Sequence, residues 1–390
     1  AYANQDDHER NLYSFKGGQI YTPGSDDNLW NAAYERIYTF NTIINNVLSS
    51  TDATDAEKHR LRAEALYQRA FEYLALVNIY ARHYHKETAA TDYGIPLITK
   101  DLVDQTYTRA TVAEVYKQIE DDLKEASKSL KEVPINLFHP YLGSLHSFYA
   151  RLYLYMGRYD DALTEAKEAL KLNDKLQDLC PYQTKDKTTW GRIVLPDGTP
   201  MLEKDDNPEA VFVRLQSGRV TIPVSTDFLA TLERRSLFYA EDTVNMGRTD
   251  YFYGETCYIL YAYQNVGFST VENMLIAAEC EARVGSKDNA MSYVNKLRDN
   301  RIKNNVALTA TDKDEALRIV LDERRREFAF TGFHRLIDLK RLNYEDKFQK
   351  NITHTADGET FTLAPNDNRY IFPINQMILN YNPGMPQYER

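Results

Sequence analysis

The chain has little cysteine, little tryptophan and no long apolar run. Its 390 residues include only three cysteines, Cys180, Cys257 and Cys280, which are too few and too widely spaced for a disulfide framework or a zinc site. No apolar run is long enough to span a bilayer. The net charge of −10 argues against non-specific nucleic-acid binding, which needs a basic surface, so we expect no nucleic-acid partner.

The usual catalytic motifs are missing as well. The sequence contains no phosphate loop, no G-x-S-x-G, no H-E-x-x-H and no paired-cysteine zinc spacing. We therefore expect no catalytic residue, no cofactor and no metal ion. Two carboxylates that meet only in space, as in glycoside hydrolases, would leave no such motif. A glycan-degrading enzyme therefore stays open as an alternative, and a reducing-sugar assay would detect it.

What the chain does have is tyrosine and helical periodicity. It contains 29 tyrosines, whose flat apolar ring and polar tip suit hydrated binding surfaces, although many tyrosines also lie in helix cores. Apolar residues at helical spacing predict helices over 28–48 and 55–84. Thr111 and Glu114 form a predicted capping box that opens a further helix over 111–131.

A tetratricopeptide-like pattern follows. Over 145–172, small residues and tyrosines recur at the offsets of two closely packed helices, with Gly157 at the turn. Residues 271–301 repeat this pattern weakly. Because one such pair cannot bury its apolar face alone, we expect four stacked pairs: 28–84, 111–172, 271–301, and a last one that begins at Thr311. The predicted fold class is mainly α, with a helical-repeat scaffold over 28–172 and 271–342.

The segment between the two scaffold blocks differs in kind. Residues 173–270 are rich in proline, glycine and turn dipeptides such as Asp197-Gly198, with one strand expected over 210–215. This segment is too long for a plain loop, so we expect an irregular, loop-rich subdomain inserted into the scaffold. The tail, 343–390, is also expected to be irregular. Together these parts make a single domain over 1–390.

The last predicted helix carries buried charge. Thr311 and Asp314 have the spacing of a capping box, and Gly332 is the expected C-terminal cap. The helix is apolar over a wide arc, so charges inside it need partners. We predict an ion-pair network that clamps this helix to its neighbours and includes Glu323, Arg324, Glu327, Arg335, Asp338 and Arg341.

These residues also carry a family resemblance. The run E-R-R-R-E-F-A-F over 323–330, with Gly332, Arg335, Asp338 and Arg341 after it, resembles the C-terminal signature of the SusD/RagB family. The run R-A-E-A-L over 62–66 and the aromatic stretch after it resemble the family's N-terminal region. The segments G-I-P-L over 94–97, Y-I-F-P-I-N over 370–375 and 380–386 resemble family features as well, so the resemblance covers most of the chain.

The resemblance implies a SusD-like fold and a role in nutrient capture. Such proteins are outward-facing lipoproteins of the bacterial outer membrane that bind a glycan or another oligomer without catalysis. They pass that nutrient to a TonB-dependent transporter of the SusC type. We expect the printed chain to be a mature or trimmed form whose lipid-bearing cysteine precedes Ala1. An oligosaccharide is the expected ligand, and a peptide is an alternative within the family.

Candidate ligand-binding residues come from two regions. In the insert, Trp190, Tyr251 and Tyr253 stand among polar residues and would offer stacking faces for sugar rings. In the loop after the helix over 55–84, His83, Tyr84 and Tyr93 are suggested by the resemblance alone. The alternative for each aromatic is a place in the core. A helical-repeat adaptor for protein partners is the remaining alternative function, although it would leave the long insert unexplained.

Overall fold

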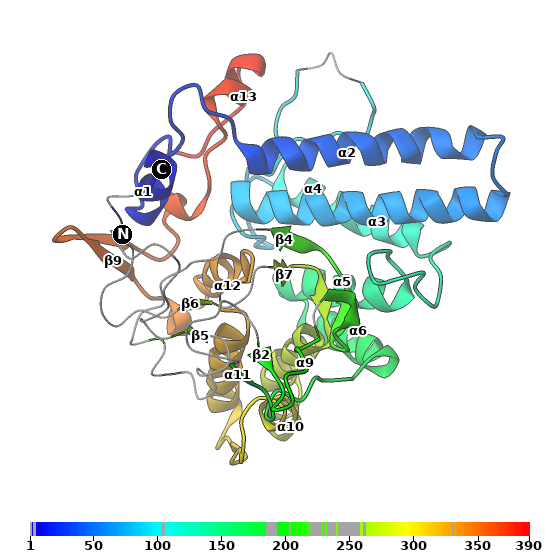
Figure 1. Cartoon of the computed structure of the whole chain (residues 1–390). Helices are drawn as coiled ribbons and strands as arrows, with labels where there is room; N and C mark the ends of the chain where they lie inside the picture. Colours follow the sequence, from blue (N-terminus) through cyan, green and yellow to red (C-terminus); the bar gives the residue numbers. More distant parts are fainter. Residues whose placement is uncertain are drawn as a thin grey trace. The chain divides into compact units, whose positions relative to one another are not determined.

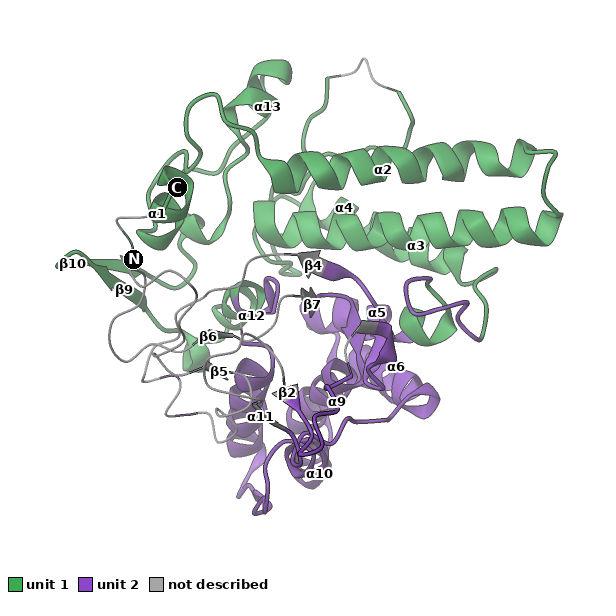
Figure 2. Ribbon diagram, in the orientation of Figure 1, with its two compact units in different colours: residues 1–132, 140–145, 336–390 green, residues 133–139, 146–335 purple. Residues whose placement is uncertain are grey.

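The computed structural model describes most of the chain: residues 2, 5–102, 106–184, 193–202, 204–217, 228, 231, 239–240, 258–259, 263–329 and 331–390. These residues form two compact units (Figure 2). Unit 1 comprises 1–132, 140–145 and 336–390, and unit 2 comprises 133–139 and 146–335. The architecture is mainly α with short strands, as the sequence predicts. No helix in the described part of the chain has the length and apolar character that a bilayer crossing needs.

Three helices form the core of unit 1: α2 (Asn28–Asn46), α3 (Asp55–Tyr80) and α4 (Val112–Ala126). The helix α3 packs against both α2 and α4 (Figure 1). Two capping boxes fix the starts of α3 and α4, one between Thr54 and Glu57 and the predicted one between Thr111 and Glu114. The buried face of α3 includes Tyr67 and Tyr73, so part of the tyrosine content belongs to the core.

A buried ion pair joins the three helices. The Arg69 guanidinium on α3 donates to both carboxylate oxygens of Asp122 on α4, at 2.6 and 2.8 Å, and to the side-chain oxygen of Asn41 on α2 at 2.8 Å. All three side chains are buried. Removing Arg69 or Asp122 alone would leave a buried charge without compensation, so a substitution of either residue should be strongly destabilising.

The rest of unit 1 consists of short elements near both ends of the chain. They are α1 (Asp7–Tyr13), η2 (Val47–Ser49), η4 (Asp346–Phe348), β9 (Ile352–Ala356), β10 (Glu359–Leu363), η5 (Asn368–Tyr370), α13 (Gln376–Tyr381) and, from Leu336 on, α12 (His334–Leu342). The guanidinium of Arg390 donates to the Gly18 carbonyl oxygen at 3.0 Å, so the two ends of the chain lie together.

The tail is more regular than predicted. Strands β9 and β10 form an antiparallel hairpin whose two-residue turn is Asp357-Gly358. Both turn residues have positive φ, 52° and 81°, as a type I′ turn requires. An Asp-Gly pair between alternating residues is a strong hairpin signal, so this element was predictable from the sequence.

Unit 2 is built around one buried helix. The helix α9 (Thr270–Val284) contacts α6 (Tyr159–Leu172), α10 (Lys287–Asp299) and α11 (Lys313–Glu327). Every residue of α9 from Thr270 to Ala282 is buried. From α5 (Leu142–Tyr155), the Arg151 guanidinium pairs with the buried Glu272 carboxylate of α9 at 2.6 Å. The turn between α5 and α6 has Gly157 at φ +71°, as the repeat pattern predicts.

The described parts of the insert contain short strands and one 3-10 turn. The antiparallel pairs are β1 (Gln183–Thr184) with β2 (Ile193–Val194), β3 (Ala210–Phe212) with β8 (Phe268–Ser269), β4 (Leu215–Ser217) with β7 (Tyr263–Asn265), and β5 (Tyr239–Ala240) with β6 (Tyr258–Ile259); the turn is η3 (Lys204–Asp206). The strand predicted over 210–215 is wrong in extent, because the chain stops pairing after Phe212 and resumes with a new partner at Leu215.

Several predicted helix boundaries are also wrong. The helix expected over 55–84 ends at Tyr80, and the one expected over 111–131 ends at Ala126. Asp312, not Thr311, is the N-cap of α11, since its carboxylate accepts the N–H of Glu315. That helix ends at Glu327, so Gly332, at φ +49°, lies four residues beyond Phe328 rather than at the C-cap.

Candidate functional site

The candidate site starts where α3 ends. After Tyr80 the backbone turns extended at Ala81, with φ −131° and ψ 170°. The last carbonyl groups of a helix lack intrahelical partners. Here the Lys340 amine, from α12, donates to the carbonyl oxygens of Asn78 and Ala81 at 2.5 and 2.6 Å. Burial lowers the pKa of Lys340 to about 7. This remote lysine therefore ends α3 and sets the direction of the loop after it.

A second buried cation holds that loop against the tail. The Arg109 guanidinium donates to the carbonyl oxygens of Tyr80, Gly94, Tyr93 and Pro386 at 2.5, 2.7, 3.3 and 3.2 Å. Burial lowers the pKa of Arg109 to about 10, so the group stays charged near neutral pH. The end of α3, the loop over 93–94 and the tail at Pro386 are thus joined at one side chain.

Two tyrosine rings lie against this cation, and a second arginine lies against one of them. Tyr93 is 43 % exposed, and its ring lies 5.5 Å from the ring of Tyr388, centroid to centroid. The Tyr388 hydroxyl donates to the Tyr93 carbonyl oxygen at 2.9 Å. The Arg82 guanidinium lies 5.2 Å from the Tyr388 centroid and pairs with the buried Asp92 carboxylate at 3.2 Å. We call Arg82, Tyr93, Tyr388 and the buried Arg109 the Tyr93 surface.

The chemistry of the Tyr93 surface suits a polyhydroxylated ligand. An exposed aromatic face packs against the C–H face of a sugar ring, and nearby cationic and amide groups donate to hydroxyls. Arg109 lies 5.8 Å from the Tyr93 centroid and 5.1 Å from the Tyr388 centroid, so both rings stack on one fixed cation. Their orientation is therefore set before any ligand binds, which lowers the entropic cost of binding.

The two other predicted residues of this loop lie deeper. His83 is buried, and its carbonyl oxygen accepts the Tyr344 hydroxyl at 3.3 Å. Tyr84 is half-buried, with its ring centroid 4.9 Å from that of Tyr116. Of the three predictions in this loop, only Tyr93 presents an exposed ring. Ligand contact by His83 and Tyr84 remains a prediction.

The predicted insert residues Trp190, Tyr251 and Tyr253 lie outside the described residues. Their role also remains a prediction.

Sequence reasoning missed most of the Tyr93 surface. Arg82, Arg109 and Tyr388 gave no signal as binding residues, because the contact between Tyr93 and Tyr388 joins positions 295 apart in the chain. A neighbouring pair was also missed: the His85 ring stacks on the exposed Tyr344 ring at 4.4 Å and 20°. Only the tertiary fold brings these residues together.

The predicted ion-pair residues have partners in both units. In unit 2, Glu323 pairs with Arg298 at 3.4 Å and with Arg326 at 3.1 Å. Glu327 pairs with Arg301 at 3.0 Å. In unit 1, Asp338 pairs with Arg341 at 2.8 Å.

Arg324 is fully buried, 3.4 Å from the His334 ring nitrogen and 5.1 Å from the Phe328 centroid. Arg335 is half-buried. Glu323 and Glu327 thus have partners that the prediction did not include: Arg298 on α10 and Arg301, which follows that helix. The six-residue network as a closed set stays a prediction.

No group of three or more His, Cys, Asp or Glu side chains among the described residues is arranged to hold a metal ion.

Comparisons with known proteins bear on the whole chain. A family model described as starch-binding and associating with the outer membrane matches residues 2–154. A second model, described as the SusD family, matches residues 271–390. The chain belongs to the SusD/RagB family. No curated protein sequence is significantly similar to this one.

Solved structures of SusD proteins share the fold. A SusD superfamily protein from Bacteroides thetaiotaomicron aligns with a TM-score of 0.73 at 20 % identity, over 99 % of this chain and 95 % of that one. A SusD superfamily protein from Bacteroides fragilis aligns with a TM-score of 0.73 at 20 % identity, over 98 % of this chain and 89 % of that one. A SusD-like carbohydrate-binding protein from Bacteroides vulgatus aligns with a TM-score of 0.68 at 19 % identity, over 99 % of this chain and 93 % of that one. The predicted SusD-like fold is confirmed.

Proposed function

We propose that this SusD-family chain binds a carbohydrate at the bacterial cell surface and does not transform it. The description of the family model that matches its N-terminal part, starch-binding and associating with the outer membrane, supports this role. The chemistry of the Tyr93 surface supports it independently: the exposed Tyr93, held in place by Arg109, packs against Tyr388, and the Arg82 guanidinium lies over the Tyr388 ring. The single observation that carries the proposal is this preorganised, exposed ring.

The finer parts of the proposal follow the family. The protein would sit on the outer membrane through a lipid anchor and would pass its ligand to a TonB-dependent transporter of the SusC type. Trp190, Tyr251 and Tyr253 of the insert would add further stacking faces. A peptide ligand is the second candidate, because the carbonyl oxygens of a peptide would also accept from Arg82 and its side chains would find a stacking face in Tyr93.

Calorimetry with a panel of neutral oligosaccharides and peptides tests the proposal. We expect an oligosaccharide to bind without turnover in a reducing-sugar assay, and Tyr93→Ala to weaken its binding about tenfold, since covering the apolar face of one aromatic ring contributes on the order of 1–2 kcal/mol. Tyr381→Ala is the matched control, because Tyr381 is 75 % exposed on α13 and takes no part in the Tyr93 surface.

Three results would contradict the proposal. Equal effects of Tyr93→Ala and Tyr381→Ala would remove the Tyr93 surface from the site. Release of reducing sugar would make the protein an enzyme. Unimpaired growth of the source bacterium on the bound glycan after deletion of the gene would argue against a role in uptake. Trp190→Ala, measured beside these variants, tests the insert.

A further inference from the structure

Unit 1 has a pocket of about 330 Å³ away from the Tyr93 surface, between α3 and the end of α4. Its lining residues come from α3, from α4 and from the turn that follows α4: His59, Arg62, Ala63, Leu66, Glu125, Lys128 and Ser129. The buried side chains of Ala63 and Leu66 form an apolar floor, and the other five are polar. The volume is at the lower end of the range for small-molecule sites, about 300–1,000 Å³.

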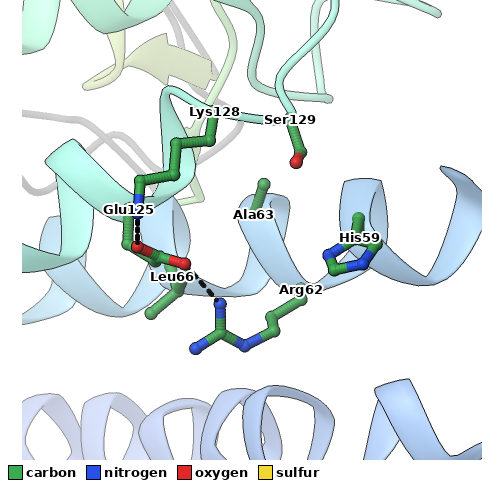
Figure 3. A pocket seen from close by; sticks show the side chains of 7 residues that line it. All are labelled: His59, Arg62, Ala63, Leu66, Glu125, Lys128 and Ser129. Carbon is green, nitrogen blue, oxygen red and sulfur yellow. Dashed lines mark hydrogen bonds and ion pairs between the residues drawn. The ribbon is translucent and has the colours of Figure 1, made fainter. Parts of the chain in front are cut away.

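The charges around this pocket are unbalanced. The Glu125 carboxylate accepts from the Arg62 guanidinium at 3.0 Å and from the Lys128 amine (Figure 3). These two cations lower the pKa of Glu125, so it is ionised at neutral pH. Two positive charges against one negative charge leave the group with a net charge of +1 while His59 is neutral. The pocket therefore favours a ligand with a single negative charge.

Hydrogen-bond donors remain for such a ligand. Arg62 uses only one terminal nitrogen for Glu125, so within the described part of the chain its other nitrogens have no protein acceptor. Lys128 likewise gives one bond to Glu125. His59 and Ser129 stand apart from this charged group in Figure 3, and neither side chain bonds another described residue. Donors thus lie at two places around the apolar floor.

We propose that this pocket binds a sugar acid, such as a uronic acid, as a second ligand site. The carboxylate would accept from Arg62 and Lys128, which already hold one carboxylate in this way. The C–H face of the ring would lie on Ala63 and Leu66, and its hydroxyls would reach Ser129 and His59. A carboxylate carries one negative charge, which matches the net charge of the pocket better than phosphate does. The choice of a sugar over other small carboxylates rests on the proposed function.

Titration of the full chain with glucuronate, glucose, acetate and inorganic phosphate, followed by NMR, tests this site. We expect glucuronate to bind at least about tenfold more tightly than the other three probes, and Arg62→Gln to weaken it about tenfold, as loss of a charge-assisted hydrogen bond implies. Glu125→Gln removes the competing carboxylate and should tighten glucuronate binding. Lys117→Gln is the matched control: it removes a cation from an exposed position of α4 outside the pocket.

The outcomes separate this proposal from the proposed function. Glucuronate binding that is lost in Arg62→Gln and kept in Tyr93→Ala supports the pocket, whatever the neutral oligosaccharides do. If glucose bound as tightly as glucuronate, the carboxylate would not contribute to binding. If acetate bound as tightly as glucuronate, the sugar ring would not contribute. Equal binding of phosphate, or an unchanged affinity in Arg62→Gln, would also overturn the assignment.

Discussion

Arg109 in unit 1 and Arg301 in unit 2 are both buried, yet they hold their surroundings by different chemistry. Arg109 donates to four backbone carbonyl oxygens, and no carboxylate in the described part of the chain pairs with it. Arg301 pairs with two carboxylates, Glu209 at 2.6 Å and Glu327 at 3.0 Å. Arg301 also donates to the carbonyl oxygens of Gln177 and Asn300, so the difference between the two cations is the pair of carboxylates.

The pKa directions follow this difference. Burial lowers the pKa of Arg109 and also acts to lower that of Arg301. At Arg301 the charges of Glu327 and Glu209 outweigh burial, so the pKa of that group is raised. A cation among dipoles can be lost without leaving an opposite charge behind. A cation between carboxylates leaves two negative charges behind when it is lost. The two regions should therefore differ in how far a substitution lowers the free energy of unfolding.

The largest effect is expected at Arg301. Arg301→Met would leave Glu209 and Glu327 largely buried and uncompensated, so the free energy of unfolding should fall by about 3–5 kcal/mol. Urea denaturation would measure this change. Arg301→Lys, which keeps the charge, should cost less. A loss below about 1 kcal/mol for Arg301→Met would mean that solvent reaches the two carboxylates.

A substitution of Arg109 should lower the free energy of unfolding less than one of Arg301, and it should also weaken ligand binding. Arg109→Met leaves only carbonyl groups unsatisfied, so we expect a loss of about 1–3 kcal/mol in the free energy of unfolding. Because Arg109 also fixes Tyr93 and Tyr388, oligosaccharide affinity should fall even where the variant remains folded. The same denaturation experiment, with calorimetry beside it, would check both. Wild-type affinity in a folded Arg109→Met would remove Arg109 from the positioning of the rings.

Lys340 sharpens the comparison, because this buried cation among carbonyl groups can lose its proton. Burial lowers its pKa to about 7 in the folded state, against an ordinary value of 10.5. Between pH 7 and pH 10.5 the unfolded chain binds more protons than the folded chain, so the free energy of unfolding rises with pH in this range. Below pH 7 the lysine is protonated in both states and does not make stability depend on pH. From pH 7 to pH 8 the gain should be about 1 kcal/mol.

The measurement is urea denaturation at several pH values, with Lys340→Met as the control. The variant lacks the titrating group, so its stability should not share this rise. Parallel curves for the two proteins between pH 7 and pH 9 would show that Lys340 keeps its ordinary pKa in the folded state.

These buried cations also show what the sequence predicts and what it does not. The helix starts at Thr54 and Thr111 are marked by capping boxes, whose residues lie three positions apart, so local patterns predict them. The end of α3 is set by Lys340, about 260 positions away, and no local pattern marked it. The family signature predicted charges at Glu323 and Glu327 that need partners, but not that Arg298 and Arg301 would supply them.

The candidate site divides in the same way. Tyr93 was predicted from its place in a loop that resembles the family. Tyr388 and Arg109 contact that loop only in the folded chain, so local sequence patterns could not predict that they belong to the same site. The hairpin over 352–363 is the opposite case, since its Asp357-Gly358 turn is a local signal that was overlooked.

The smallest effect is expected where a charge pair is exposed. Lys117 and Asp121 on α4 pair across one helical turn at 2.5 Å, with side chains that are 72 % and 54 % exposed. An exposed pair at this spacing contributes about 0.3–0.5 kcal/mol, and the order with lysine N-terminal to the acid is the weaker one. Lys117→Gln should therefore change the free energy of unfolding by less than about 0.5 kcal/mol.

High salt provides the further check on this pair. Because exposed charges are screened, 1 M NaCl should erase the difference between Lys117→Gln and the wild type while leaving the loss in Arg301→Met largely intact. A large, salt-resistant effect at Lys117 would contradict the division between exposed and buried charges. It would also disqualify this variant as the control for the α3–α4 pocket, where an unchanged fold is what makes the Arg62→Gln result interpretable.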